Sequence, residues 1–230
     1  LMHFNNIAII TARKGSKRIK NKNLRSFNGR PIIYYSIKAL QKTKLFNKII
    51  VSTNCDKTEK ISRKYGIKDI IRRPNYLSSN NIGTITVINH AIKDLKKKLY
   101  IPKIICCLYP AAPLTKPKNI IYAYNQLNKK GKGFIYPSTK LKKKIKKNKI
   151  TKGLIDIKKI KKKEGIVNDI YLDAGQFWIA KTKTWENSKT VYKKNSSTFC
   201  IEEVKSDINT FNDWKEIEKI YLRNKKKYVS

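Results

Sequence analysis

Short apolar segments alternate with amphipathic segments along most of this 230-residue chain, and this alternation constrains its fold more than any other feature. Three apolar runs closed by polar residues predict buried strands at Asn6–Thr11, Lys48–Thr53 and Lys103–Tyr109. Apolar residues at helical spacing predict helices over Ile32–Thr43, Asp56–Tyr65, and Thr84 to about Lys98. Strands that alternate with helices through short connections form βαβ units. We therefore predict an α/β fold with a mostly parallel sheet.

The second half of the chain continues this pattern with shorter segments. It predicts a helix over Ile120–Leu127, and strands over Gly133–Pro137, Gln176–Ala180 and Thr198–Val204. Thr210–Asp213 resembles a capping box, in which a hydroxyl and a carboxylate satisfy the first N–H groups of a helix. A final helix is expected after it, with Trp214, Ile217, Ile220 and Tyr221 along its length.

A lysine-rich segment interrupts the alternation between about residues 138 and 172. The run Lys140–Lys163 has isolated apolar residues and one acid. We interpret it as a solvated excursion from the sheet, with a hairpin turn at Lys152–Gly153; the alternative is an arm that binds a partner or a polyanion. The length suits one large domain, so we expect residues 1–230 to form a single domain that includes this excursion.

The chain carries 54 lysine and arginine residues against 15 aspartate and glutamate residues, a formal net charge of +39. A field of this sign attracts nucleic acid without regard to sequence, so a basic nucleic-acid-binding protein is one candidate. Lysine, asparagine and isoleucine are abundant in every part of the chain, however, which favours biased composition in an AT-rich genome over a selected surface. No helix-turn-helix, zinc-finger or stacking motif supports the nucleic-acid hypothesis. We expect non-specific binding only.

Cysteine usage and hydropathy predict a cytoplasmic protein. Cys55, Cys106, Cys107 and Cys200 have no C-x-x-C spacing and no neighbouring histidines, which argues against zinc and for free thiols. No apolar stretch approaches the ~20 residues that span a bilayer, and no signal-peptide core is present at the start. We therefore expect no membrane association.

The loop after the first strand, Ala12–Asn23, is the strongest candidate for a ligand site. It combines Gly15, which allows close backbone approach, with the Ser16 hydroxyl and several cations. In parallel sheets ligands bind beyond the carboxyl ends of the strands, where this loop begins. Backbone N–H groups and cationic side chains together bind phosphates. The G-x-x-x-x-G-K-[ST] pattern is absent, so this loop is not a P-loop.

Eight segments, in order along almost the whole chain, resemble the sugar cytidylyltransferases, which activate acidic sugars with CTP. They are Ala12–Asn23, Phe27–Ile37, Val51–Thr53, Arg73–Ser78, Gly83–Thr84, Tyr109–Leu114, Leu172–Trp178 and Ser206–Trp214. Within that family, the Asp173–Phe177 stretch is similar to the pseudaminic acid branch. The resemblance implies a nucleotide-diphospho-sugar-transferase-like, Rossmann-type domain. It also implies a homodimer formed through the excursion.

The resemblance also implies roles for single residues. Phosphate and nucleotide contacts would come from Arg13, Gly15, Ser16, Lys22 and Asn23. Cytosine and ribose would be recognised by Arg73 and Thr84, and the sugar pocket would be lined by Tyr109, Asp173 and Gln176. Lys17 would neutralise triphosphate charge, and Asp207 with Asn209 would hold Mg²⁺.

The implied reaction is attack by the anomeric hydroxyl of an acidic nine-carbon sugar on the α-phosphorus of CTP. The chain departs from the family at Asn209, which replaces a second carboxylate, at Lys14 and at Ala111, and it lacks an arginine in Gly165–Asp169. Three alternatives therefore stay open beside pseudaminic acid activation. They are the same chemistry on sialic, legionaminic or keto-deoxy sugar acids, a non-catalytic nucleotide-binding homologue, and the nucleic-acid-binding protein.

Overall fold

The computed structural model describes residues 6–79, 81–131, 133–141, 145–146, 154–155, 166–167, 170–202, 206–224 and 228. One half of its central sheet is parallel, in the order β5 (Asp69–Arg72), β4 (Lys48–Thr53), β1 (Asn6–Thr11) and β6 (Ile104–Leu108). β1 lies between β4 and β6, with Ile9 opposite both Ile50 and Cys107. Its residues are almost all buried because helices cover both faces, which explains its continuous apolar sequence. The predicted α/β fold is confirmed.

The other half of the sheet is built largely from antiparallel strands. β12 (Phe177–Lys181) pairs with β6, β7 (Ile135–Leu141) with β12, and β11 (Ile170–Asp173) with β7, all antiparallel. β9 (Leu154–Ile155) extends this edge, and β13 (Ser197–Cys200) pairs with β7 in parallel. β8 (Ile145–Lys146) and β10 (Ile166–Val167) form a separate pair. The sheet is therefore mixed, with its parallel half next to the first loop.

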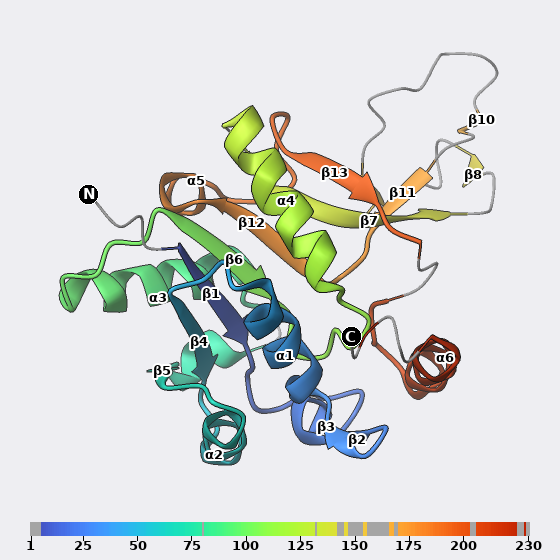
Figure 1. Cartoon of the computed structure of the whole chain (residues 1–230), viewed down its shortest axis with the longest axis horizontal. Coiled ribbons are helices and arrows are strands. Elements are labelled where there is room, and N and C mark those ends of the chain that lie inside the picture. Colours follow the sequence, from blue (N-terminus) through green and yellow to red (C-terminus); the bar gives the residue numbers. More distant parts are fainter. Residues whose placement is uncertain are drawn as a thin grey trace.

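Two layers of helices cover the sheet (Figure 1). On one face, α1 (Ile33–Thr43) and α4 (Pro117–Lys130) bury Ile37 and Leu127 against the strands. On the other face, α3 (Thr84–Lys97) and α5 (Thr182–Glu186) bury Ile88 and Trp185. α2 (Asp56–Lys64) follows β4 at the edge of the parallel half. Buried apolar area of this extent is the main source of stability.

A third apolar cluster joins the C-terminal helix to the N-terminal third of the chain. α6 (Phe211–Arg223) places Trp214 against Phe27, with ring centroids 5.6 Å apart, and Tyr221 against Tyr35 at 5.2 Å. Phe27 lies in a small hairpin of β2 (Ser26–Phe27) and β3 (Arg30–Pro31). Ile19 of the first loop and Ile208 are fully buried in the same cluster. This packing brings residues 206–209 close to the first loop.

Most predicted elements have nearly the predicted bounds, and the differences have local causes. α4 begins three residues early because Pro117 occupies its first turn, and it ends where Gly131 takes a positive φ of 71°. The capping box of α6 is present as predicted. The late strand predicted over Thr198–Val204 is β13, which ends at Cys200. β5, β11 and α5 were not predicted because segments of four or five residues carry too little periodicity.

Most of the lysine-rich run lies outside the described residues, including the predicted turn at Lys152–Gly153. The single-domain arrangement and the homodimer stay predictions. Of the run Lys140–Lys163, the structure describes residues 140–141, 145–146 and 154–155, which belong to β7, β8 and β9. All four cysteines are free thiols. Among the helices of the described part of the chain, none is long and apolar enough to cross a bilayer.

Candidate active site

A cavity of about 560 Å³ opens at the carboxyl ends of the parallel strands, between the first loop and residues 207–209. Its volume is in the range of small-molecule sites. Thr11 and Tyr109 line its floor at or just beyond the ends of β1 and β6. The predicted loop and the predicted acidic residue share it, because Ser16 and Asp207 both line its wall.

The first loop folds back on itself in a defined conformation. Gly15 has a φ of 88°, a region that glycine enters without steric cost, and Asn21 is left-handed at 54°. A single 3-10 turn, η1 (Lys22–Leu24), follows. Two hydrogen bonds anchor the loop: Asn54 accepts from the Lys14 N–H at 2.8 Å, and Asn23 donates to the Arg13 carbonyl at 3.0 Å. Asn23 is therefore a buried brace of the loop as well as a cavity residue.

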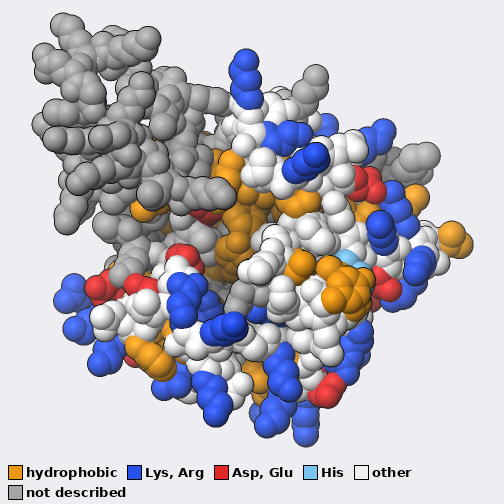
Figure 2. Space-filling view, turned by 180° about the vertical axis from the view of Figure 1, so that it is seen from behind, with side chains coloured by type: hydrophobic (Ala, Val, Ile, Leu, Met, Phe, Trp, Pro, Cys, Tyr) orange, Lys and Arg blue, Asp and Glu red, His pale blue; other side chains and the backbone are white. Residues whose placement is uncertain are grey.

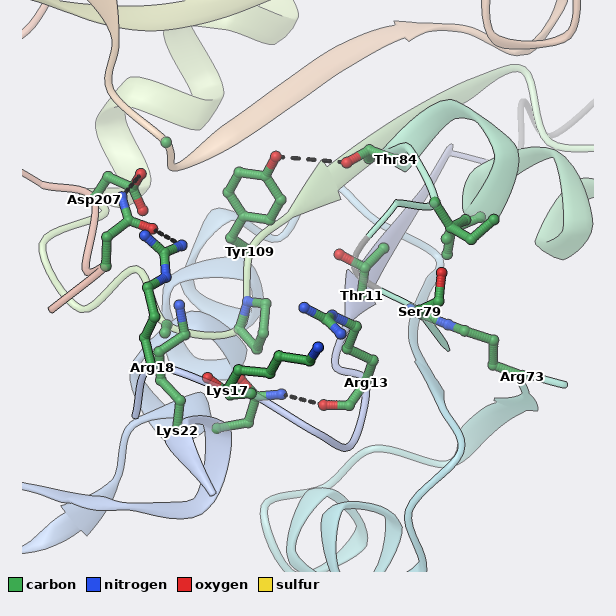
Figure 3. A pocket seen from close by; sticks show the side chains of 18 residues that line it. Thr11, Arg13, Lys17, Arg18, Lys22, Arg73, Ser79, Thr84, Tyr109 and Asp207 are labelled. Carbon is green, nitrogen blue, oxygen red and sulfur yellow. Dashed lines mark hydrogen bonds between the residues drawn. The ribbon is translucent and has the colours of Figure 1, made fainter. Parts of the chain in front are cut away.

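Four cations of this loop line the cavity: Arg13, Lys17, Arg18 and Lys22. Figure 3 shows them along one wall, with Lys17 extending toward Arg13. Lys22 is half-buried and donates to the Ile208 carbonyl at 2.8 Å. Its pKa lies below the usual lysine value, mainly because burial disfavours the charged form, while Asp207 opposes that effect. A polyanion such as a triphosphate would complement this wall.

One carboxylate, Asp207, lines the cavity beside Arg18 and is held by its neighbours. Arg18 donates from Nη2 to Asn209 Oδ1 at 2.6 Å, and Asn209 donates from Nδ2 to Asp207 Oδ2 at 2.6 Å. A guanidinium only donates hydrogen bonds, so the atom of Asn209 that faces Arg18 has to be its oxygen. Asn209 therefore turns its N–H₂ group toward Asp207 (Figure 3).

Arg73 and Thr84, which the sequence assigned to the base and ribose, lie on the far side of the cavity from Asp207. Arg73 is almost fully buried and donates from Nη2 to the Ser52 carbonyl at 3.0 Å. Burial lowers its pKa to about 10. The hydroxyls of Thr84 and Tyr109 approach to 3.5 Å. Of the residues predicted to line the sugar pocket, Tyr109 lines this cavity.

The two other residues predicted for the sugar pocket do not line this cavity. Asp173 accepts from the Gly175 N–H at 2.8 Å and from the Tyr192 hydroxyl at 3.1 Å. Burial raises its pKa to about 6, while its hydrogen bonds oppose the rise. Gln176 is fully buried, and its amide has no hydrogen-bond partner within the described part of the chain. Their contact with a sugar stays a prediction.

The structure thus gathers most of the predicted site residues around one cavity. Ten of them line it: Arg13, Ser16, Lys17, Lys22, Asn23, Arg73, Thr84, Tyr109, Asp207 and Asn209. Gly15 lines a smaller adjoining cavity with Arg13 and Lys17.

Sequence reasoning assigned no role to Arg18, Ser79, Gly175 or Tyr192. Arg18 lay within the loop motif, and only its charge could have pointed to it. Nothing in the sequence links Tyr192 to Asp173, or Gly175 to Asp207, because these pairs are joined only by the fold.

The donor set of this cavity fits a magnesium ion that is bound mainly by phosphate oxygens. Asp207 is the one carboxylate among the described residues that line the cavity. No group of three or more His, Cys, Asp or Glu suited to a metal occurs among the described residues, so an all-protein cage is not formed there. Mg²⁺ prefers oxygen ligands, keeps several waters and commonly uses one or two carboxylates beside substrate phosphates. Ligation by Asn209 stays a prediction.

Comparisons with known proteins cover nearly the whole chain. A family model described as cytidylyltransferase matches residues 7–227. A pseudaminic acid cytidylyltransferase of Campylobacter jejuni is 29% identical over 227 residues, which cover 95% of this chain and 97% of that protein. A CMP-N,N'-diacetyllegionaminic acid synthase of Legionella pneumophila is 27% identical over 230 residues, or 97% of this chain and 99% of that one.

The fold has close counterparts among solved structures. A CMP:2-keto-3-deoxy-manno-octonic acid synthetase complexed with CTP superposes with a TM-score of 0.70, at 12% identity, over 95% of this chain and 99% of that one. A 4-diphosphocytidyl-2C-methyl-D-erythritol synthase from Anaerococcus prevotii gives 0.65 at 16% identity, over 96% and 99% of the two chains. At these identities the likeness shows the fold alone.

Proposed function

Because the chain belongs to the cytidylyltransferase family, we propose that it transfers CMP from CTP to the anomeric hydroxyl of a nonulosonic acid, with pseudaminic acid as the substrate. The observation that carries the proposal is the shared cavity, in which the cationic first loop faces Asp207. The Campylobacter relative supports pseudaminic acid through its name and its full-length similarity. The family places the chain among CTP-using enzymes, and the cavity supplies groups suited to a triphosphate.

In the proposed reaction the anomeric oxygen forms a bond to the α-phosphorus, and the bond from that phosphorus to the bridging oxygen breaks. Pyrophosphate leaves, and the hydroxyl proton is lost to solvent or base. Such transfer depends mainly on positioning and on stabilising charge. Lys17, with Arg13 and Lys22, would neutralise the triphosphate and the departing pyrophosphate, and Ser16 would donate to a phosphate oxygen.

The same cavity also contains the residues that we assign to the cytidine and to the sugar. Arg73 and Thr84 would hold the cytidine end, and Tyr109 would face the sugar near the reacting phosphorus. Asp207, with Asn209 beside it, would hold Mg²⁺ through carboxylate and amide oxygens. When bound, the ion would supply charge neutralisation and orientation of the phosphates. We also propose a homodimer and a cytoplasmic location, which gives access to the CTP pool and suits the free thiols.

Pyrophosphate release tests this function directly. The full chain with CTP, Mg²⁺ and synthetic pseudaminic acid should release pyrophosphate, and Asp207→Ala should lower kcat/KM by roughly 10²–10³-fold, as when a key charge-stabilising group is removed. Legionaminic, sialic and keto-deoxy sugar acids form the comparison panel, since the Legionella relative is also similar along its full length.

The outcomes of this assay separate the alternatives. A higher kcat/KM for another sugar of the panel would replace pseudaminic acid but keep the chemistry. CTP binding without turnover of any sugar would identify a non-catalytic homologue. Salt-sensitive binding to DNA that survives Arg13→Ala and Asp207→Ala, without CTP binding, would favour the nucleic-acid-binding alternative.

A further inference from the structure

The turn between β11 and β12 packs against Asp207, and its Gly175 lines the same cavity. Its backbone is shaped by Asp173, whose Oδ1 accepts the Gly175 N–H at 2.8 Å, and Gly175 takes a φ of 63°. The turn is also joined to the segment before Asp207, because the buried Ser206 hydroxyl donates to the Ala174 carbonyl. These two segments are distant in sequence, and the Ser206–Ala174 hydrogen bond joins them.

Gly175 and Asp207 are packed too closely for a side chain to fit between them. A Cβ atom built on Gly175 would lie 2.8 Å from Asp207 Cβ, 2.9 Å from its Cγ and 3.3 Å from its Oδ1. Carbon atoms attract at about 3.5–4.0 Å and repel strongly at the two shorter distances. The bare α-carbon of Gly175 is therefore the surface on which the Asp207 side chain rests.

Asp207 is exposed to solvent, but moving its carboxylate away from Gly175 would disturb the contacts that hold it. On the cavity side its Oδ2 accepts from Asn209 Nδ2, and Asn209 is in turn held by Arg18. Before it in the chain, Ser206 is tied to Ala174, and after it Ile208 is fully buried. A methyl group at position 175 would have to rotate the carboxylate or push the 206–208 segment away from the turn.

We propose that Gly175 is a positioning residue that sets the direction of the Asp207 carboxylate toward the metal-bound triphosphate. The proposal rests on the proposed function, in which Asp207 holds the metal. It assigns to Gly175 a steric role that only glycine fulfils, since every other residue adds a Cβ at 2.8 Å from Asp207. Arg73 and Thr84, at the nucleotide end, lie on the far side of the cavity from Asp207 and should keep their positions.

Gly175→Ala, with Gly29→Ala as a matched control, tests the proposal by binding. Gly29 has a φ of 80°, and a Cβ there meets nothing within 4 Å, so the control carries the backbone strain without the collision. In the presence of CTP, Gly175→Ala should bind Mn²⁺ about 10–100-fold more weakly, as when an outer-shell partner of a ligand is lost. Metal-free CTP affinity should stay within about twofold of wild type. Mn²⁺ is followed by water-proton relaxation and CTP by calorimetry.

A second pair of measurements separates the collision from a general folding defect. Asp207→Gly removes the side-chain atoms with which a Cβ at position 175 would collide. In that background, Gly175→Ala should therefore lower the melting temperature no more than Gly29→Ala lowers it in wild type. In a crystal structure of Gly175→Ala, the Asp207 carboxylate should be displaced from its position in a crystal structure of the wild type.

Two results would overturn the positioning role: Mn²⁺ affinity of Gly175→Ala equal to that of Gly29→Ala, or an unmoved Asp207 in the crystal. Wild type that binds CTP and Mn²⁺ but turns over no sugar acid would instead count against the proposed function, and the displacement of Asp207 would still decide the role of Gly175.

Discussion

The two carboxylate oxygens of Asp173 contact two different parts of the site. Its Oδ1 shapes the turn that supports Asp207, and its Oδ2 accepts from Tyr192, whose ring packs edge-on near Tyr136 at 6.1 Å. Burial is the largest influence on its pKa and raises it to about 6. The charge of Asp207 acts in the same direction, whereas hydrogen bonds from Gly175 and Tyr192 and the nearby Trp178 indole act against it.

This raised pKa predicts a pH-dependent penalty on stability. Between pH of about 4 and 6 the folded chain binds the Asp173 proton more tightly than the unfolded chain, so this group lowers the free energy of unfolding as pH rises through that window. Asp173→Asn keeps an oxygen acceptor for Gly175 and removes the charge. It should therefore be more stable than wild type by about 2 kcal/mol above pH ~6.5, with the gain vanishing near pH ~4.

Urea unfolding in EDTA at both pH values measures this difference for Asp173→Asn. Asp207, Tyr192 and Tyr109 are titratable groups that interact electrostatically with this carboxyl. All three remain in the variant. A stability difference that does not change with pH would contradict the assigned cause, because it would mean that packing and not ionisation separates the two proteins.

At the scale of elements, the start of α6 organises the segment that carries Asp207 and Asn209 as well as the helix. The Asp213 carboxylate accepts from the Thr210 N–H at 2.6 Å and from the Asn209 N–H at 2.8 Å, and Thr210 accepts from the Asp213 N–H at 3.2 Å. The capping box thus extends one residue backwards into the cavity wall. Trp214, the next residue, packs on Phe27 and connects the helix to the hairpin beyond the first loop.

Asp213→Ala should therefore affect stability and the site together. Loss of the Asp213 half of the capping box should cost about 1 kcal/mol of unfolding free energy. Release of the Asn209 backbone should also weaken Mg²⁺ binding. Pyrophosphate release should then need a higher Mg²⁺ concentration to reach its half-maximal rate. Lys215→Ala, an exposed change on the same helix, is the control and should leave both quantities near wild type. Equal effects of the two substitutions would argue against the cap as the cause.

At the scale of the whole molecule, the net charge of +39 is an energetic burden. Basic side chains are scattered across the face shown in Figure 2 and are not gathered in one patch. Scattered like charges repel one another in the compact state and attract polyanions without specificity. The scatter agrees with biased composition, whereas Arg13, Lys17, Arg18 and Lys22 are set apart because they line one cavity.

Salt should therefore stabilise this protein. Without ligand, the melting temperature should rise by a few degrees between low and physiological ionic strength, because screening shortens the reach of charge repulsion to about 8 Å. Thermal unfolding in a sodium chloride series measures this. A melting temperature that falls over the same range would show that attractive ion pairs, such as Lys48 with Asp69, outweigh the repulsion.

Much of the fold and many site residues followed from the sequence because their signals are local. Strand β1 has an unbroken apolar run, with Ile7 and Ile9 on one face and Ala8 and Ile10 on the other, as expected of a strand buried on both faces. The Thr210–Asp213 box predicted the start of α6 from four residues. Because Gly15 and Ser16 follow β1 closely, the sequence placed the first loop at the sheet edge where the cavity opens.

Only the tertiary structure decided how Asp207 and Asn209 are held at the cavity. Burial of Ile19, Phe27, Ile208 and Trp214 in one cluster brings the C-terminal segment to the first loop. That approach allows Arg18 to bind Asn209 and leaves Gly175 in contact with Asp207. Periodicity and motifs report what a segment prefers by itself, whereas contacts between distant segments depend on packing of the complete core, which no local pattern encodes.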